Sequence, residues 1–287
     1  MLRHSEQVRL LSPVDLPTIM RLLSTSEYIY QRFTPDELKH ILRNYPSLGL
    51  SHGKSLHSFL LSQTVNPPSA WIGGFGVSWT ESRSYLRFLE IEIEALHERL
   101  REREVRYLHY SGNDLSNDWL HAPLLDRGFR PYRQLYAYDK FDYQIPSQGN
   151  LKVILRPARI SDIPTIMALE ELCFEQFWRY DALSFVDILS THPYFMVAEL
   201  QGQVVGYQFN ALDGEYGYLV RIAVDPAFNH QGIGARLMAE AISFFRHAGS
   251  TRIMLNTQED NHHAHSLYEW FGFVRIQQIG FVLRLEL

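Results

Sequence analysis

Two glycines between an apolar run and a helical pattern could bind an anion. Gly232 and Gly234 follow the run 219–224, whose β-branched residues and closing Asp-Pro turn indicate a buried strand. Apolar residues then recur at helical spacing over 233–248. The first N–H groups of a helix lack partners and carry partial positive charge. Because glycines let this backbone approach a phosphate closely, the segment predicts a pyrophosphate-binding loop.

Two known phosphate loops do not fit this pattern. A P-loop requires Lys and then Ser or Thr after its last glycine, but Ala235 and Arg236 follow Gly234. A dinucleotide-binding fingerprint requires a third Gly or Ala where Leu237 stands. The loop therefore belongs to another class of anion site.

A second constellation follows at 261–273, which reads Asn-His-His-Ala-His-Ser-Leu-Tyr-Glu-Trp-Phe-Gly-Phe. It resembles motif B of the GNAT superfamily, the GCN5-related N-acetyltransferases, and Asn-His-Gln-Gly-Ile-Gly at 229–234 resembles motif A of the same family. The match departs at Asn229, where the family has Arg or Gln. The resemblance implies that residues 153–287 form an acetyl-CoA-binding domain.

The resemblance also implies which residues meet the coenzyme. The end of the strand would pair with the pantetheine arm, and the N–H of Ala223 or Val224 would polarise the thioester carbonyl. The expected contacts are Ile222, Ala223, Val224, Asn229, His230, Gln231, Gly232, Ile233, Gly234, Ala235, Asn261 and Tyr268.

Catalysis requires an acid for the leaving thiolate and a neutral amine. The resemblance assigns the acid to Tyr268, although a core tyrosine on an amphipathic helix is the structural alternative. By the same resemblance, family members often carry a glutamate that acts as general base where Tyr218 stands. Glu215, three positions earlier, is the candidate base here, but only if the strand bulges or a water relays the proton. Asn261 either caps its helix or contacts the coenzyme.

Other reactive side chains favour structural roles. His262, His263 and His265 coincide with the second motif and lie at a helix start, so no metal site is expected. Cys173, the one cysteine, has apolar neighbours on a helix, which favours a buried thiol over a nucleophile.

An internal repeat divides the chain. With a shift of 147, Arg9 and Asp15 fall on Arg156 and Asp162, and Pro-Thr-Ile-Met occurs at both 17–20 and 164–167. The segment 142–151 is rich in polar residues, Pro and Gly, and predicts a linker. We therefore expect two domains, 1–145 and 152–287.

The first domain lacks the phosphate loop. The same shift places Tyr85 and Arg87 opposite Gly232 and Gly234, and their side chains would obstruct a phosphate. Leu124 stands opposite Tyr268. The first domain is therefore expected to be a degenerate acetyltransferase fold.

The pattern predicts an α+β fold of two tandem GNAT-like domains, each a central mixed β-sheet flanked by helices. In the second domain we expect helices at 162–174, 181–190, 233–248 and 262–271, strands at 153–157, 194–200, 203–212, 216–224 and 252–257, and a closing hairpin at 273–286.

The expected function is transfer of an acetyl group from acetyl-CoA to a primary amine of a small molecule or peptide N-terminus. The alternative is a non-catalytic acyl-CoA-binding or scaffold protein. A net charge of −5 predicts no nucleic-acid partner, and the absence of a long apolar run predicts no membrane partner and a cytoplasmic location. The sequence leaves the acceptor and the oligomeric state open.

Overall fold

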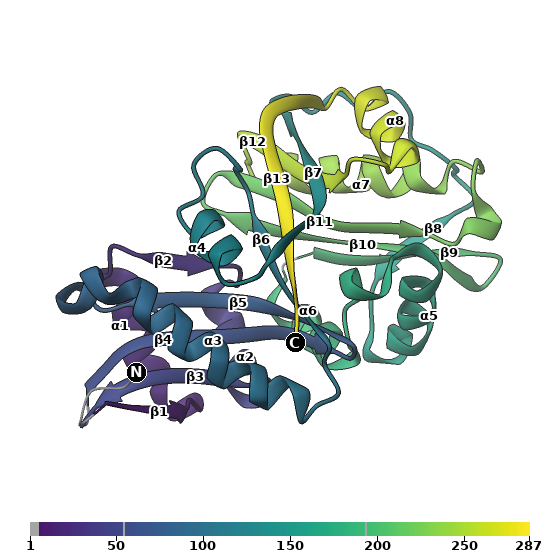
Figure 1. Cartoon of the computed structure of the whole chain (residues 1–287). Coiled ribbons are helices and arrows are strands. Elements are labelled where there is room, and N and C mark those ends of the chain that lie inside the picture. The colour runs from purple at the N-terminus through teal and green to yellow at the C-terminus, as the bar shows by residue number, and fades with distance from the viewer. Residues whose placement is uncertain (1–5, 54, 193) are drawn as a thin grey trace. The chain divides into compact units, whose positions relative to one another are not determined.

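Apart from one short extra strand in the first half, the same order of strands and helices occurs twice along the chain (Figure 1). The computed structural model describes residues 6–53, 55–192 and 194–287. The chain forms two compact units, each packed mainly within itself. Unit 1 comprises residues 1–111, 119–132 and 283–287, and unit 2 comprises 112–118 and 133–282.

The first half of the chain contains these elements: β1 (Glu6–Leu10), α1 (Leu16–Thr25), β2 (Ile29–Gln31), α2 (Leu38–Asn44), β3 (Ser47–His52), β4 (Ser55–Asn66), β5 (Ser69–Val77), α3 (Tyr85–Arg101), β6 (Tyr107–Gly112), α4 (His121–Asp126) and β7 (Arg130–Lys140). The second half contains β8 (Ile154–Pro157), α5 (Ile163–Cys173), α6 (Ala182–Thr191), β9 (Tyr194–Leu200), β10 (Gln203–Asp213), β11 (Tyr216–Val224), α7 (Ile233–His247), β12 (Arg252–Gln258), α8 (His262–Trp270) and β13 (Val274–Glu286).

Each unit has a mixed sheet. In unit 1 the strands follow the order β1-β3-β4-β5-β6, and β2 pairs with β5. In unit 2 the order is β8-β9-β10-β11-β12-β7-β13. The pairs β5–β6 and β11–β12 are parallel, whereas the other registered pairs are antiparallel. The expected mixed α+β fold is confirmed.

The expected hairpin at 273–286 is wrong. This segment forms the single strand β13, because β7 from the first half of the chain lies between β12 and β13 in unit 2. Residues 133–140 consequently belong to unit 2 and residues 283–287 to unit 1, so the compact units are not continuous stretches of chain. Assignment of separate functions to 1–145 and 152–287 stays a prediction.

The sheet of unit 2 is covered on both faces. Helices α5 and α6 pack on the face that carries Tyr207, Phe209 and Ala223. Helices α7 and α8 pack on the opposite face, which carries Leu219 and Leu255. Side chains alternate between the faces along a strand, and the bulge at Val220 shifts this alternation, so Leu219 and Ala223 face opposite sides although they are four residues apart.

A repeated ion pair fixes the first helix of each half. Arg9 donates two hydrogen bonds to Asp15, at 3.1 and 2.6 Å, and Arg156 donates two to Asp162, at 2.8 and 3.0 Å. Neither carboxylate caps the helix that follows it. Each instead accepts from a backbone N–H three residues earlier, because a short 3-10 turn precedes the helix.

No helix in the described ranges 6–53, 55–192 and 194–287 is both long and apolar enough to cross a membrane.

The ion pair predicts a pH-dependent contribution to stability. Arg156 lowers the pKa of Asp162 below its usual value of 3.8 through hydrogen bonding, so the pair stabilises the fold above that pH and loses effect as the pH falls further. Replacement Asp162→Asn should lower the free energy of unfolding by about 1–3 kcal/mol at pH 7, measured by urea denaturation. The difference from the wild type should shrink below pH 3.8. A constant difference across this range would contradict the role of the charge.

Candidate active site

Strands β11 and β12 pair over three residues and then separate. Residues 216–218 lie in parallel register with 252–254. Beyond this point β11 keeps β10 as its partner to Val224, and β12 keeps β7 as its partner to Gln258. Among the residues that the structure describes, 219–224 therefore have a strand partner on one side only, and we call this stretch the open edge of β11.

The hydrogen bonds with β10 decide which backbone groups face the open edge. Asp225 N–H donates to Val205 O of β10 at 2.9 Å, and this hydrogen bond continues the β10–β11 ladder. Successive residues of an antiparallel strand direct their N–H groups to opposite sides. Ala223 N–H consequently points toward β10, and Val224 N–H points to the open edge. Of the two N–H groups expected to polarise a thioester, only that of Val224 is directed there.

The predicted phosphate loop lies at the end of the open edge. Asn229, His230 and Gln231 are exposed, and Ile233 and Ala235 direct their side chains into the core. Gly232 is the N-cap of α7 with a φ of 73°, and His230 has a φ of 60°. These left-handed residues turn the chain sharply, so the first N–H groups of α7 are available to an anion.

The space beside Gly234 is open. A β-carbon built at this position would meet only Leu267, at 3.4 Å, and Val224, at 3.9 Å, which are ordinary contacts. Leu267 belongs to α8, so the second predicted motif packs against the first turn of α7. The structure therefore brings the two sequence motifs together, beside the end of β11.

Tyr268 lies in the core between α7 and α8. Its side chain is only 5% exposed and shares a hydrophobic cluster with Ala235 and Leu255. The Tyr138 ring is at its edge, with centroids 5.9 Å apart. Burial raises the pKa of Tyr268, with a further contribution from Tyr138, so this phenol keeps its proton at neutral pH. A protonated phenol near the loop suits proton donation, and a core role is compatible with the same geometry.

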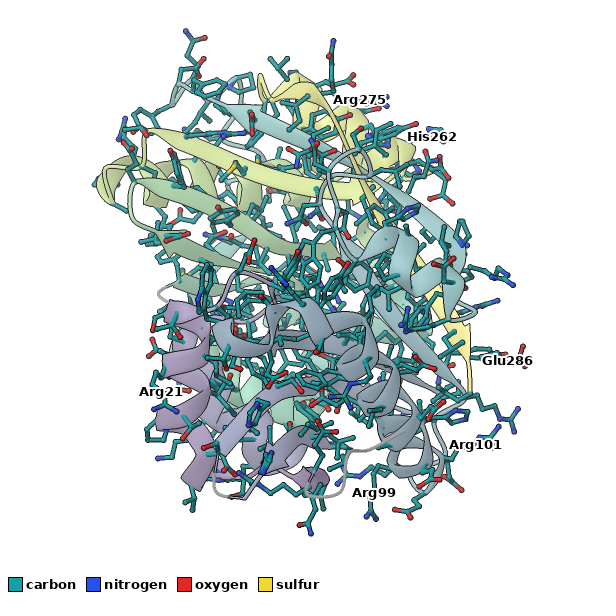
Figure 2. All side chains as sticks on the ribbon, turned by 60° about the vertical axis from the view of Figure 1, so that its left-hand side comes forward. Arg21, Arg99, Arg101, His262, Arg275 and Glu286 are labelled. Atoms are coloured by element: carbon teal, nitrogen blue, oxygen red, sulfur yellow. The ribbon has the colours of Figure 1, made fainter. Side chains whose placement is uncertain are left out.

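Asn261 caps α8. Its side-chain oxygen accepts from Ala264 N at 3.2 Å, which satisfies one of the first N–H groups of the helix. His262 is exposed at the surface of this helix (Figure 2), and His265 contacts Tyr138 O–H at 2.7 Å and Glu259 O at 3.1 Å through its two ring nitrogens. Both nitrogens of His265 are thus engaged by the protein.

Glu215 is not brought to this site. It lies in the turn before β11, exposed, and its carboxylate accepts from Thr251 Oγ1 at 2.9 Å. At about 3.3 Å per residue, the nine residues from Glu215 to Val224 span about 30 Å. Proton transfer over that distance would require a long water chain, so the geometry gives Glu215 no role as the base.

A buried polar cluster at the open edge was not expected from the sequence. Glu170 of α5 accepts hydrogen bonds from Tyr207 O–H, from Tyr180 N at 3.0 Å and from Arg221 Nη2 at 2.8 Å. Arg221 also lies over the Phe174 ring at 3.8 Å. The available signal was an arginine inside the apolar run 219–224, since a charge in a buried strand requires a partner.

This cluster fixes the segment after α5. Arg221 of β11 donates to Trp178 O, and Glu170 of α5 accepts from Tyr180 N, so the chain at the end of the 3-10 turn Gln176–Trp178 is tied to both elements. Burial and the adjacent Glu170 carboxylate hold the pKa of Tyr207 well above its usual value. A carboxylate that already accepts three hydrogen bonds serves as an anchor for this segment.

Cys173 is half-buried beside the end of β11. Its thiol donates to Val224 O at 3.2 Å, and burial raises its pKa to about 11. The nucleophilic thiolate is therefore scarce at neutral pH.

Unit 1 contains the same open edge, but its own chain fills it. Strands β5 and β6 pair only over 69–71 and 107–109, which repeats the β11–β12 register with a shift of 147 along β5. Gly73 is skipped in the β4–β5 ladder as Val220 is in β10–β11. Beyond this point, β2 pairs with residues 74–76 of β5.

The backbone group equivalent to Val224 N–H is occupied in unit 1. Val77 N–H donates to Tyr28 O at 3.3 Å, and Tyr85 stacks on the Tyr28 ring with centroids 4.4 Å apart. Trp119 lies at the edge of both rings, 5.2 and 5.6 Å away. Tyr85, expected to obstruct a phosphate, thus also closes the edge where a pantetheine arm would pair.

Comparison with known proteins finds a family resemblance in the second half of the chain. Residues 162–273 match the model of the acetyltransferase (GNAT) family. This segment of the chain is similar to the GNAT family. Among curated relatives, a putative ribosomal protein bS18-alanine N-acetyltransferase of Bacillus subtilis is 28% identical over 123 residues, which cover 42% of this chain and 80% of that protein.

Three further comparisons concern one more curated relative and two solved structures. A mycothiol acetyltransferase of Thermobispora bispora is 33% identical over 88 residues, covering 28% of this chain and 30% of that protein. A tandem GNAT protein from the clavulanic acid biosynthesis pathway has a TM-score of 0.68 at 13% identity and covers 98% of both chains. A GCN5-related N-acetyltransferase from Sphaerobacter thermophilus has a TM-score of 0.63 at 13% identity, over 100% of this chain and 97% of that one. The likeness at this identity shows the fold, which is that of two tandem GNAT domains.

Gly234 offers a test of the phosphate loop. Replacement Gly234→Glu should weaken acetyl-CoA binding by about 30-fold or more, because its carboxylate adds negative charge where the pyrophosphate is expected. Gly234→Ala should bind like the wild type, since a β-carbon there meets only ordinary contacts. Isothermal titration calorimetry measures both affinities, and thermal melting should show both variants folded. Wild-type affinity in Gly234→Glu would contradict the placement of the coenzyme.

Proposed function

We propose that the protein transfers an acetyl group from acetyl-CoA to a primary amine of a small molecule or peptide N-terminus, by direct attack in a ternary complex. The observation that carries the proposal is the convergence of three features in unit 2. The open edge of β11 ends at a loop suited to a phosphate, with open space beside Gly234 and with the phenol of Tyr268 in the adjoining core.

Coenzyme binding would use backbone groups. The N–H groups of the α7 start would bind the pyrophosphate, and residues 222–224 would pair with the pantetheine arm. Val224 N–H would then stabilise the negative charge that develops on the thioester oxygen during attack. Asn229, His230 and Gln231, exposed on the loop, would add side-chain contacts.

The amine would attack the thioester carbonyl carbon, the carbon–sulfur bond would break, and Tyr268 would donate its phenol proton to the thiolate and then regain a proton from solvent. A phenol with a pKa near 10 or above can protonate a thiolate without being ionised beforehand. The proton released by the amine would pass to solvent.

Because Glu215 lies too far from the open edge to act as general base, the site favours an acceptor amine with a low pKa. An α-amine has a pKa near 8, so about a quarter is neutral at pH 7.5, whereas only about 0.1% of a lysine side chain with pKa 10.4 is neutral. We therefore propose an α-amine or another weakly basic primary amine as the acceptor. The names of the bS18-alanine and mycothiol relatives support an amine acceptor of either peptide or small-molecule type.

Replacement Tyr268→Phe tests the catalytic assignment. The variant should lose about 100-fold or more in kcat while its affinity for acetyl-CoA stays unchanged, because only the proton donor is removed. Release of free coenzyme A, with peptides bearing a free α-amine as acceptors, measures turnover. Tyr216→Phe, an exposed phenol at the far end of β11, is the matched control and should retain full activity.

Three outcomes separate the hypotheses. Full turnover of Tyr268→Phe would remove the acid role. Binding of acetyl-CoA without turnover of any amine in the wild-type protein would favour the non-catalytic acyl-CoA-binding alternative. Absence of binding would contradict the proposed function altogether.

A further inference from the structure

The linker between the two halves lies along helix α7. This segment, residues 142–151, is held near both ends of the helix. Tyr143 O–H donates to Ser250 O just after α7, and Asn150 bonds to the chain just before it. Tyr143 and Ile145 also pack against the core cluster that α7 shares. Seven residue steps reach about 24 Å, close to the roughly 22 Å length of a 15-residue helix. We call this segment the strap.

The strap contacts the phosphate loop through Asn150. Its backbone N–H donates to Gly232 O at 3.1 Å, and its side-chain Nδ2 donates to Gln231 O at 2.9 Å. Asn150 is itself fixed, because its Oδ1 accepts from Lys152 N at 3.0 Å and its carbonyl accepts from Val153 N at 3.1 Å. One residue of the strap therefore holds two consecutive carbonyls of the loop.

These carbonyls matter for an anion site. A phosphate requires N–H groups directed toward it, and a carbonyl oxygen in the same place would repel it. His230 and Gly232 both have left-handed backbone angles. If the peptide groups between them rotated, each C=O would point where its N–H now points. Asn150 Nδ2 holds the Gln231 carbonyl on the side of the strap. The Gly232 carbonyl accepts both from Asn150 N–H and, at 3.0 Å, from Arg236 N–H, which is the first hydrogen bond of α7.

Close packing of Gly149 adds a steric constraint. A β-carbon at this position would lie 2.5 Å from Gly232 O and against Arg236 N, and its φ is +67°. Only glycine brings the strap this near to the first turn of α7. The strap and the loop are therefore closely packed against each other at Gly149.

We propose that Asn150 and Gly149 of the strap are positioning residues of the coenzyme site, which hold the phosphate loop in the conformation that receives a pyrophosphate. This inference rests on the proposed binding of acetyl-CoA by unit 2. The connection between the two halves would then contribute to coenzyme binding. Because such coupling is reciprocal, coenzyme binding would in turn stabilise the strap in its docked position.

Titration of acetyl-CoA into full-length variants tests the inference. Asn150→Ala should weaken binding by about 5- to 30-fold. Gly149→Val should weaken it at least as much, because its side chain cannot fit against Gly232 O and Arg236. Gln148→Ala is the matched control, since Gln148 is exposed on the same strap, and it should bind like the wild type.

A second readout distinguishes positioning from loss of fold. Thermal melting of Asn150→Ala should stay close to that of the wild type, and hydrogen exchange over 146–152 should slow when acetyl-CoA binds the wild-type protein. Wild-type affinity in Asn150→Ala, or no change in exchange over the strap, would overturn the inference while leaving the proposed function intact. Failure of the wild-type protein to bind acetyl-CoA would instead contradict the proposed function.

Discussion

The structure of unit 2 depends on the early separation of two parallel strands. After Tyr218 and Met254 the pairing between β11 and β12 ends, while β11 remains paired with β10 and β12 remains paired with β7. An unpaired strand edge inside a protein must find hydrogen-bond partners elsewhere. The bulge at Val220, the anchor of Arg221 on Glu170 and the turn into α7 all lie along this edge, and together they fix where a ligand backbone could pair with it.

Unit 1 shows a second solution to the same constraint. Its β5 separates from β6 at the equivalent residue, and the chain supplies β2 as the missing neighbour. Val77 N–H and Tyr28 O form there the hydrogen bond that we expect Val224 N–H to form with a thioester. In unit 1 the chain's own β2 satisfies this strand edge, and in unit 2 we propose that a ligand satisfies it.

The sequence predicted the elements that depend on local pattern. Strand β11, the glycine turn and helix α7 lie where apolar periodicity and turn residues place them, and both motifs meet beside Gly234. A shift of 147 read from Arg9 and Asp15 also aligns β5 with β11. These features are specified within a few residues of themselves, which is why one sequence suffices to find them.

Features that depend on long-range pairing could not be found in this way. The chain after α8 has the alternation of a strand, but nothing local tells that β7, more than 130 residues earlier, would take the place of a hairpin partner. The role of β2 depends on three residues with no motif, and that of Asn150 on a linker composition that usually indicates a free segment. The distance of Glu215 from Val224 likewise required the geometry of the turn before β11.

Hydrogen exchange over the two equivalent edges tests the account most directly. Peptides covering 72–78 and 219–225 should be compared by mass spectrometry with and without saturating acetyl-CoA. The account predicts that 72–78 is already protected in the free protein and does not change, whereas 219–225 exchanges faster and gains protection on binding. Gain of protection at 72–78, or none at 219–225, would contradict the claim that one edge is filled by the chain and the other by the coenzyme.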